Sequence, residues 1–493
     1  MKPSSFIERR LRKFTDRGDA GSGSFHRPFG RLDITDVGIA LGLTFAAAII
    51  IFPALGTQSL ATWDEAIYGV VTRELLAHPG LTLHYGVTPW FEKPPFLFWL
   101  MAGSAMTFGL TEFALRLPAA IFGVGAIVLQ YFAGRRLGGR VAGIMAAILL
   151  LGVAQFVAYS RLAMTDVPLT ALGMLAIVLI LYGENRKTFN VAAGAAFGLA
   201  ILTKSVAAFL FLPGLLAIII AQRGVASLWS RDILLAGAVA LGIALPWHIW
   251  SALTYGRSFI DQYLVFHVLD RFAEPLEGHE GGPFYYFSTY AYNAGWFALV
   301  HAGGIALALA LAIRQRDRLL AAVVLLALGA FAIINAQGTK IGWYLTPVYP
   351  GAALAAAVGI TRLLRSPAAR ITAVLVAVLV AVPAFIDGRG RFAEDYDILD
   401  YSPEIRALRN LPTFAKTRIP VLYTIGLSDP ALRFYLADHV ESIDDVKFER
   451  LLTANRHFMC LTFKPVVREL FNKPPHSSMQ IIAATESLVV IAH

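Results

Sequence analysis

Charged side chains gather in the stretches that separate the long apolar runs of this sequence. Asp64 and Glu65 follow the first apolar run in ATWDEAIYGVV, and Glu92 and Lys93 precede two prolines in WFEKPPF. Charges are costly inside a membrane, so they concentrate where they are used or where water reaches them. Acids and bases at the ends of apolar runs therefore predict a catalytic or binding site at one face of a membrane.

Asp64 is open to two interpretations. It could cap a helix that starts at Glu65, which would place Tyr68 and Thr72 on one face of that helix. A carboxylate fixed at the membrane surface can also accept the proton of an incoming hydroxyl or amine. Asp166 in SRLAMTDVPLT presents the same choice between a helix cap and a second site acid.

The cations between the apolar runs point to an anion. Lys93 lies between Glu92 and a Pro-Pro pair, so its ammonium is held near the headgroup level, where it could simply extend to lipid phosphate. A single bound phosphate is the alternative, because ammonium and guanidinium groups pair well with phosphoryl oxygens. Arg271 and Lys340, from two other loops, could join Lys93 there.

Two histidines are candidates for metal ligands. His267 in QYLVFHVLDRF and His279 in EGHEGGPFYYF could bind a divalent metal ion together with Glu92 or Asp64. Single histidines at an interface also serve as ordinary hydrogen-bonding residues, and neither an H-x-x-x-H nor an H-E-x-x-H pair occurs here. Tyr285 and Tyr344 belong to aromatic groups that fit an interfacial belt and would equally hold a sugar or a lipid tail.

Composition identifies the class of protein. The chain has 493 residues, 57% hydrophobic and 15% charged, with a mean hydropathy of +0.62, which is typical of a polytopic membrane protein. The net charge of +9 lies in the N-terminal tail and in short loops and forms no contiguous basic face, so nucleic acid is not an expected partner. Cys460 is the single cysteine. Nucleotide-binding motifs of the GxxxxGK[ST] and GxGxxG kinds are missing, so we expect no nucleotide cofactor.

Apolar runs long enough to cross a membrane predict about eleven transmembrane helices. They lie near 37–55, 116–134, 141–159, 167–183, 190–203, 206–221, 232–252, 290–313, 319–335, 343–361 and 371–386. A further run, 95–110, would invert the topology of everything after it if it crossed. The loops that share a side with the N-terminal tail hold most of the Lys and Arg only if this run does not cross, so we expect an interfacial or re-entrant helix there.

This topology predicts three parts. Residues 1–36 form a basic cytoplasmic tail, and residues 37–386 form a transmembrane domain with outer loops at 56–115 and 253–289. Residues 387–493 contain strand-like runs such as IPVLYTIG and SLVVIAH around helix-like ones, which indicates a small soluble α/β domain. The active site and this domain would face the periplasm of a bacterial inner membrane, and we expect a monomer.

The order of the motifs resembles a known family. WDEAIYGVVTREL, GVTPWFEKPPFLFWL, FALRLPAAIFG, SRLAMTDVPL, HVLDRF, GPFYYF and TKIGWYLTPVYPGAAL occur in the order seen in the GT-C superfamily of polyprenyl-phosphate-sugar-dependent glycosyltransferases. The resemblance covers about residues 37–362 and is strongest to the bacterial branch that contains the lipid A aminoarabinose transferase, which is related to the protein O-mannosyltransferases. This chain is shorter than expected for the aminoarabinose enzyme.

The resemblance implies roles for individual residues. Asp64 matches the family's first-loop carboxylate, which acts as catalytic base or orients the acceptor; Tyr68 matches the tyrosine four residues on, and Asp166 matches the second acid. Lys93 and Arg271 match the cations that hold the donor phosphate. Glu92 matches a metal ligand of the family, His267 matches the second-loop histidine, and Lys340 and Tyr344 match the run that closes the donor site. Apart from these matches, we expect His267 to join Glu92 as a metal ligand, and we expect the substrate pocket to include Glu65, Tyr68, His279 and Tyr285.

Together these observations predict an integral-membrane glycosyltransferase. It would move a sugar from an undecaprenyl-type phosphate to an envelope lipid or glycan by direct inverting displacement. A protein acceptor is the first alternative. A transporter of lipid-linked sugars is the second, and it predicts charges deep within the spans, where only Lys204 comes close.

Overall fold

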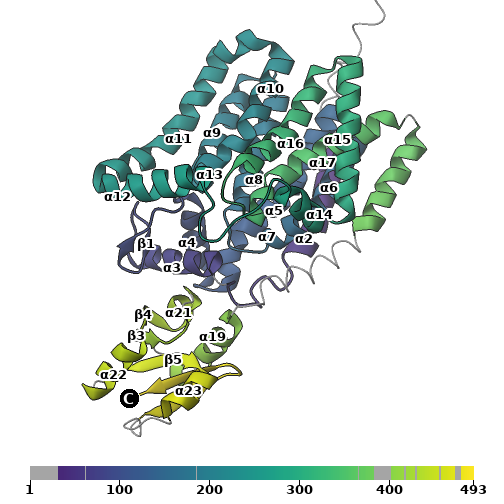
Figure 1. Cartoon of the computed structure of the whole chain (residues 1–493). Coiled ribbons are helices and arrows are strands. Elements are labelled where there is room, and N and C mark those ends of the chain that lie inside the picture. Colours follow the sequence, from purple (N-terminus) through teal and green to yellow (C-terminus); the bar gives the residue numbers. More distant parts are fainter. Residues whose placement is uncertain are drawn as a thin grey trace, which may run out of the picture.

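The protein consists of a helical bundle and a small sheet domain that lies beyond one end of it (Figure 1). The computed structural model describes residues 32–381 apart from 62, 185 and 365, and residues 401–493 apart from 416, 417, 428, 429, 455, 456 and 472–478. Most of the predicted tail, residues 1–31, and the predicted boundary at 386/387 lie outside the described residues.

Each predicted apolar run corresponds to a helix of the bundle. In chain order these helices are α2 (Ile34–Ile51), α5 (Glu112–Gly138), α6 (Arg140–Leu151), α8 (Asp166–Tyr182), α9 (Lys187–Lys204), α10 (Leu212–Arg223), α11 (Arg231–Tyr255), α15 (Trp296–Gln315), α16 (Arg318–Ala336), α17 (Val348–Leu363) and a last apolar helix, Pro367–Ala381. Among the described residues, 6 helical segments are long and apolar enough to cross a membrane, when α9 and α10 count as one segment, Lys187–Arg223. The helical fold expected from composition is confirmed.

Several predicted runs are interrupted in ways that composition does not reveal. The run 141–159 breaks at Gly152 into α6 and α7 (Ala154–Tyr159), where an added Cβ would lie 2.6 Å from the ring of Phe297. The run 290–313 breaks at Gly295, whose φ of +53° separates α14 (Tyr285–Ala294) from α15. A 3-10 helix, η2 (Ser205–Phe211), joins α9 to α10, and further 3-10 helices are η3 (Val225–Trp229) and η5 (Gly342–Leu345).

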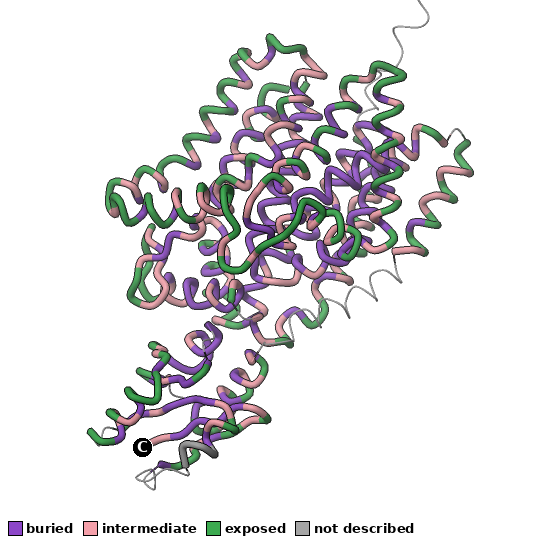
Figure 2. The backbone as a smooth tube through the Cα atoms, in the orientation of Figure 1, coloured by how far each residue is buried: buried purple, intermediate pink, exposed green. Residues whose placement is uncertain are grey.

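Two connections carry structure of their own, and we call them the first long loop (residues 52–111) and the second long loop (residues 256–284). The first contains α3 (Asp64–Ala77), a short hairpin of β1 (His84–Tyr85) and β2 (Thr88–Pro89), and α4 (Phe96–Phe108). The second contains α12 (Arg257–Phe259), a π-helix η4 (Ile260–Asp270) and α13 (Arg271–Ala273). Its residues 272–284 are mostly exposed (Figure 2).

Helix α4 corresponds to the ambiguous run 95–110. It begins after Pro95 and ends at Gly109, which has a φ of +77°. Its 13 residues extend about 20 Å at a rise of about 1.5 Å per residue, which is less than the roughly 30 Å of a bilayer's hydrocarbon core. It packs against α5 and α3, so it covers the end of the bundle and does not extend through it.

The terminal domain is the α/β unit that the sequence predicts. Its elements are α19 (Ser402–Arg409), α20 (Pro412–Ala415), β3 (Ile419–Thr424), α21 (Pro430–Tyr435), β4 (Ala437–Ser442), α22 (Asp445–Thr453), β5 (Met459–Phe463), α23 (Lys464–Phe471), β6 (Gln480–Ala484) and β7 (Leu488–Ala492). The strand order is β4-β3-β5-β7-β6; β3 is parallel to β4 and β5, and β7 is antiparallel to β5 and β6. Helix α21 packs against α3 of the first long loop (Figure 1).

Candidate active site

The two candidate acids each stand at the first residue of a helix. Helix α3 begins at Asp64, and its N-cap is Trp63, without a side-chain capping bond. Helix α8 begins at Asp166 after Thr165 in the same way. The interpretation of these acids as helix caps is therefore wrong, because neither carboxylate is used to close its own helix.

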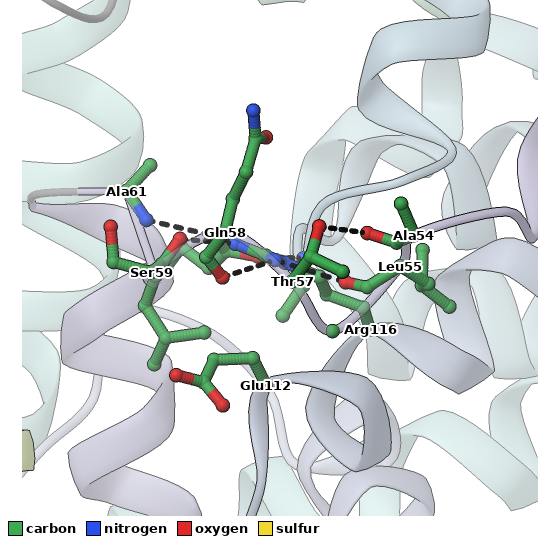
Figure 3. Close-up of polar contacts among 12 residues, drawn as sticks. Ala54, Leu55, Thr57, Gln58, Ser59, Ala61, Glu112 and Arg116 are labelled. Atoms are coloured by element: carbon green, nitrogen blue, oxygen red, sulfur yellow. Dashed lines mark hydrogen bonds and ion pairs between the residues drawn. The ribbon is translucent and has the colours of Figure 1, made fainter. Parts of the chain in front are cut away.

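Glu65, the neighbour of Asp64, belongs to a buried hydrogen-bond network centred on Arg116 of α5. The Arg116 guanidinium donates to Glu65 from Nε at 2.7 Å, and its terminal nitrogens donate to the carbonyls of Leu55, Gln58 and Ser59 at 3.0, 2.9 and 2.6 Å (Figure 3). The Glu65 carboxylate also accepts two backbone N–H groups. Glu65 lines the candidate pocket, as expected, but its carboxylate is occupied in holding the chain that leads into α3.

The terminal domain also contacts the segment that leads into α3. Tyr435 of α21 accepts a hydrogen bond from the backbone N–H of Leu60 at 2.8 Å and donates to Glu112 at 2.9 Å. Arg406 of α19 forms an ion pair with Glu112 at 2.8 Å. Asp64 is thus held from one side by the bundle and from the other by the terminal domain.

A cavity of about 1210 Å³ opens where the two long loops meet the bundle. Asp64, Glu92 and Lys93 enter it from the first long loop, and Asp166 enters it from α8. The second long loop and the helices on that side complete its polar lining with His267, Arg271, Glu277, His279, Lys204 and Tyr344. Another part of the lining is apolar and includes Val206, Phe209, Leu210, Val268, Leu269 and Ile333.

Asp166 is the most deeply held of the acids. It is buried, and its Oδ1 accepts a hydrogen bond from Nζ of Lys204 at 2.6 Å. The same ammonium lies 5.5 Å from the ring centroid of Tyr344, in cation–π contact. Oδ2 of Asp166 has no hydrogen-bond partner in the described part of the chain, so the cavity retains one unused buried acceptor.

Asp64, Glu92 and Asp166 lie close enough together to influence the same groups. Burial raises the pKa of Tyr68 well above its usual value, and the negative charges of Asp64, Asp166 and Glu92 raise it further. Burial also raises the pKa of Glu92, which Lys93 opposes and Asp64 reinforces. The acids from the first long loop and from α8 therefore form one electrostatic cluster.

The cations form a neighbouring cluster. Nζ of Lys93 lies 3.9 Å from the carboxylate of Glu92. Burial lowers the pKa of His267 to about 3, and the positive charges of Lys93 and Arg271 lower it further, so this imidazole is neutral at pH 7. Lys93 from the first long loop and Arg271 from the second thus face a common space, as expected for an anion site.

The predicted metal site gains no support from this arrangement. Glu92 and His267 line the same cavity, but the described residues contain no group of three or more His, Cys, Asp or Glu side chains placed to hold a metal ion. The cations beside both residues also repel a divalent ion, so the residues as arranged do not fit one. The metal stays a prediction, and no step below depends on it.

Three predicted site residues are not among the described residues that line the cavity. Nζ of Lys340 donates to the backbone carbonyl of Asn335 at 2.6 Å and lies 5.4 Å from the ring centroid of Tyr286. Tyr285 packs edge-on against Tyr286, and Tyr68 packs between Trp90 and Phe98. Lys340 and Tyr285 support the second long loop and the segment beside it, and Tyr68 lies beneath the acids.

Lys204, Glu277 and Trp63 are among the cavity residues that sequence reasoning did not assign. Lys204 ends an apolar helix, and a lysine at that depth is a signal for a buried acidic partner. Glu277 and Trp63 gave no comparable signal. Both adopt positive φ values, +56° and +63°, which are rare for residues other than glycine and asparagine and which no local pattern reveals.

A family model and curated proteins match parts of this sequence. A family model described as dolichyl-phosphate-mannose-protein mannosyltransferase matches residues 92–250. An uncharacterized protein of Aquifex aeolicus is 26% identical over 310 residues, 62% of this chain and 60% of that protein. An undecaprenyl phosphate-alpha-4-amino-4-deoxy-L-arabinose arabinosyl transferase of Pseudomonas fluorescens is 31% identical over 209 residues, 40% of this chain and 36% of that protein. The chain therefore spans less than two thirds of the length of these curated relatives.

Solved structures match a larger part of the chain. The crystal structure of ArnT from Cupriavidus metallidurans bound to undecaprenyl phosphate is 20% identical and covers 92% of this chain and 98% of that chain, with a TM-score of 0.69. The archaeal oligosaccharyltransferase AglB from Archaeoglobus fulgidus, in complex with an inhibitory peptide and a dolichol-phosphate, is 15% identical and covers 87% and 70%, with a TM-score of 0.56. At these identities the likeness establishes the fold.

Proposed function

Because this multi-pass membrane protein has the ArnT-like fold of the GT-C superfamily, we propose that it is a glycosyltransferase with a polyprenyl-phosphate sugar as donor. The observation that carries the proposal is the composition of its cavity. Acids and cations from both long loops meet there, beside an apolar wall that suits an isoprenoid chain. ArnT of Cupriavidus metallidurans, whose fold this chain shares, was crystallised with undecaprenyl phosphate.

The proposed reaction is a direct displacement at the anomeric carbon of the donor sugar. An acceptor hydroxyl or amine attacks this carbon while the bond to the phosphate oxygen breaks, so the anomeric configuration inverts. Asp64 accepts the proton that the acceptor loses. The bonding electrons leave with the polyprenyl phosphate, whose charge Lys93 and Arg271 stabilise.

The buried Asp166–Lys204 pair has a different role in this proposal. Lys204 pairs with Asp166 and fixes it in place, so we assign the role of proton acceptor to Asp64 and not to Asp166. Its unpaired Oδ2 can accept a hydrogen bond from the donor sugar. Tyr344, in contact with Lys204, would close the donor side of the site.

We further propose that the acceptor is an envelope lipid or glycan and that the protein acts as a monomer. The cavity would open to the periplasm and the N-terminal tail would lie in the cytoplasm of a bacterial inner membrane. This orientation is supported by the excess of Lys and Arg in the loops that share a side with the tail. A protein acceptor would use the same donor chemistry.

The decisive experiment compares wild type with Asp64→Asn. The purified full-length protein is reconstituted in lipid with a radiolabelled polyprenyl-phosphate sugar and total envelope lipid. We expect transfer to fall by a factor of about 10² to 10⁴ in the variant, while binding of undecaprenyl phosphate is unchanged. The labelled product identifies the acceptor.

Asp445→Asn is the matched control. Asp445 is the exposed first residue of α22, as Asp64 is of α3, so the same change is made at the same helical position away from the cavity. This variant should transfer at the wild-type rate. Normal transfer by Asp64→Asn would remove Asp64 from the mechanism, and label crossing the bilayer without transfer would favour a transporter.

A further inference from the structure

The second long loop contains a glutamate that pairs with one of the clustered cations. Nη2 of Arg271 donates to Oε2 of Glu277, six residues further along the chain. The Glu277 side chain is 50% exposed, whereas that of Arg271 is 16% exposed. Both residues line the cavity, so the pair lies at its edge with the carboxylate on the solvent side.

The backbone is shaped to present Glu277 to Arg271. Glu277 has a φ of +56°, and Gly278 follows with a φ of +76°. The turn is closed by a hydrogen bond from the His279 N–H to the Leu276 carbonyl, and the Leu276 N–H donates to Oγ1 of Thr339. A left-handed conformation at a glutamate is unfavourable and persists only where its surroundings impose it.

Arg271 and the residues beside it have hydrogen-bonding capacity that Glu277 does not use. Nε of Arg271 is buried without a hydrogen-bond partner in the described part of the chain, and so is Nδ1 of His267, four residues earlier. Lys93 faces the same space. The donor's phosphate is a diester that carries one negative charge, as Glu277 does, but its two free oxygens can accept hydrogen bonds from Arg271 and Lys93 together. The monoester that remains after transfer carries more charge and binds these cations more strongly.

We propose that Glu277 is an internal competitor for the donor's phosphate group. In the ligand-free protein it neutralises Arg271, and the phosphodiester of the incoming donor displaces it. After transfer, the carboxylate returns to Arg271 and favours release of the polyprenyl phosphate that remains. This inference rests on the proposed function, because it takes the donor phosphate to bind at Lys93 and Arg271.

The test titrates undecaprenyl phosphate into the purified full-length protein in nanodiscs of zwitterionic lipid, which offers no competing anionic headgroup. Wild type is compared with Glu277→Gln, and binding is followed by the shift in thermal unfolding. We expect Glu277→Gln to bind undecaprenyl phosphate about two to five times more tightly than wild type, the range expected for loss of one partly exposed competing ion pair. Without ligand, the variant should unfold at a slightly lower temperature.

Glu280→Gln is the matched control, because Glu280 is exposed in the same loop and no hydrogen bond or ion pair joins its side chain to another described residue. It should bind the probe as wild type does. Equal tightening in both variants would assign the effect to the net charge of the loop, and no tightening in either would leave Glu277 an ordinary surface ion pair. Either result would overturn the proposed displacement of Glu277 by phosphate, but it would not contradict the proposed donor site. If none of the three proteins binds the probe, the donor site and the exchange are both wrong.

Discussion

The first long loop supplies the candidate base and the second supplies a candidate phosphate-binding cation, and the two are held in different ways. Arg116 and Glu65, which fix the chain before α3, have side chains only 4% and 1% exposed. The ion pair of the second long loop, Arg271 with Glu277, includes a carboxylate that is half exposed, and its flanking residues 272–284 are mostly exposed (Figure 2). The ion pair that anchors the first loop is buried, whereas water reaches the ion pair of the second loop.

The difference matches the tasks proposed for the two loops. A general base works only when it stays within hydrogen-bond reach of the proton that it takes. A rigidly held backbone before α3 would therefore favour catalysis by the proposed base, Asp64. A site for a lipid phosphate must open to admit the donor and to release the spent carrier, which requires contacts that break easily. We therefore expect mutations in the first loop to cost stability and those in the second to change ligand affinity.

The largest expected effect comes from Arg116→Met. Removal of one partner from a buried ion pair leaves Glu65 charged and uncompensated, at a cost of about 3–5 kcal/mol in the free energy of unfolding. Denaturation of the purified protein in detergent measures it. Arg257→Met, at an exposed arginine of the second long loop, should change stability little. The double variant Arg116→Met with Glu65→Met should recover part of the loss, because neither charge is then left alone.

A smaller effect is expected from Tyr435→Phe. The change leaves the N–H of Leu60 without its acceptor and removes one donor from Glu112, which should cost about 1–2 kcal/mol. Hydrogen exchange should then rise in residues 55–65, and kcat should fall while the donor KM changes little. Tyr423→Phe, in β3 of the same domain, is the control, and equal exchange in both variants would show that the terminal domain does not hold the first long loop.

The smallest expected effect on stability comes from Glu277→Gln. Its ion pair is partly exposed, so the free energy of unfolding of the ligand-free protein should fall by less than about 1 kcal/mol. Thermal unfolding in the same detergent as used for Arg116→Met gives a direct comparison. A loss as large as that of Arg116→Met would mean that the two loops are anchored equally, and the contrast between them would disappear.

Much of the fold could be predicted because membrane helices follow from hydrophobicity alone. The apolar runs, the α/β pattern of the terminal domain and the short helix α4 needed only composition and charge bias. The interruptions at Gly152 and Gly295 could not be predicted, because neither break coincides with a charged residue or a proline in the sequence. The break at Gly152 depends on the nearby ring of Phe297, and the break at Gly295 depends on the positive φ of that glycine.

Several residues of the candidate site could be predicted from the sequence, but the contacts that their side chains make could not. Charges at the ends of apolar runs marked Asp64, Lys93, Asp166 and Arg271, and all four line one cavity. The helix-cap interpretation of Asp64 failed because capping preferences do not reveal where a helix begins once Glu65 is bound to Arg116. Lys340 was grouped with the phosphate ligands from its charge, whereas its ammonium is bound to a nearby carbonyl.

The contact between Leu60 and Tyr435 joins residues that are 375 positions apart in the chain. During synthesis the N–H of Leu60 emerges before most helices of the bundle, and its acceptor emerges after them. The contacts that hold the segment before Asp64 are therefore completed only when the terminal domain has folded against the first long loop. We expect a chain truncated before α21 to form the helices of the bundle but to hold Asp64 loosely, so folding of the terminal domain would be a late step in assembling the proposed active site.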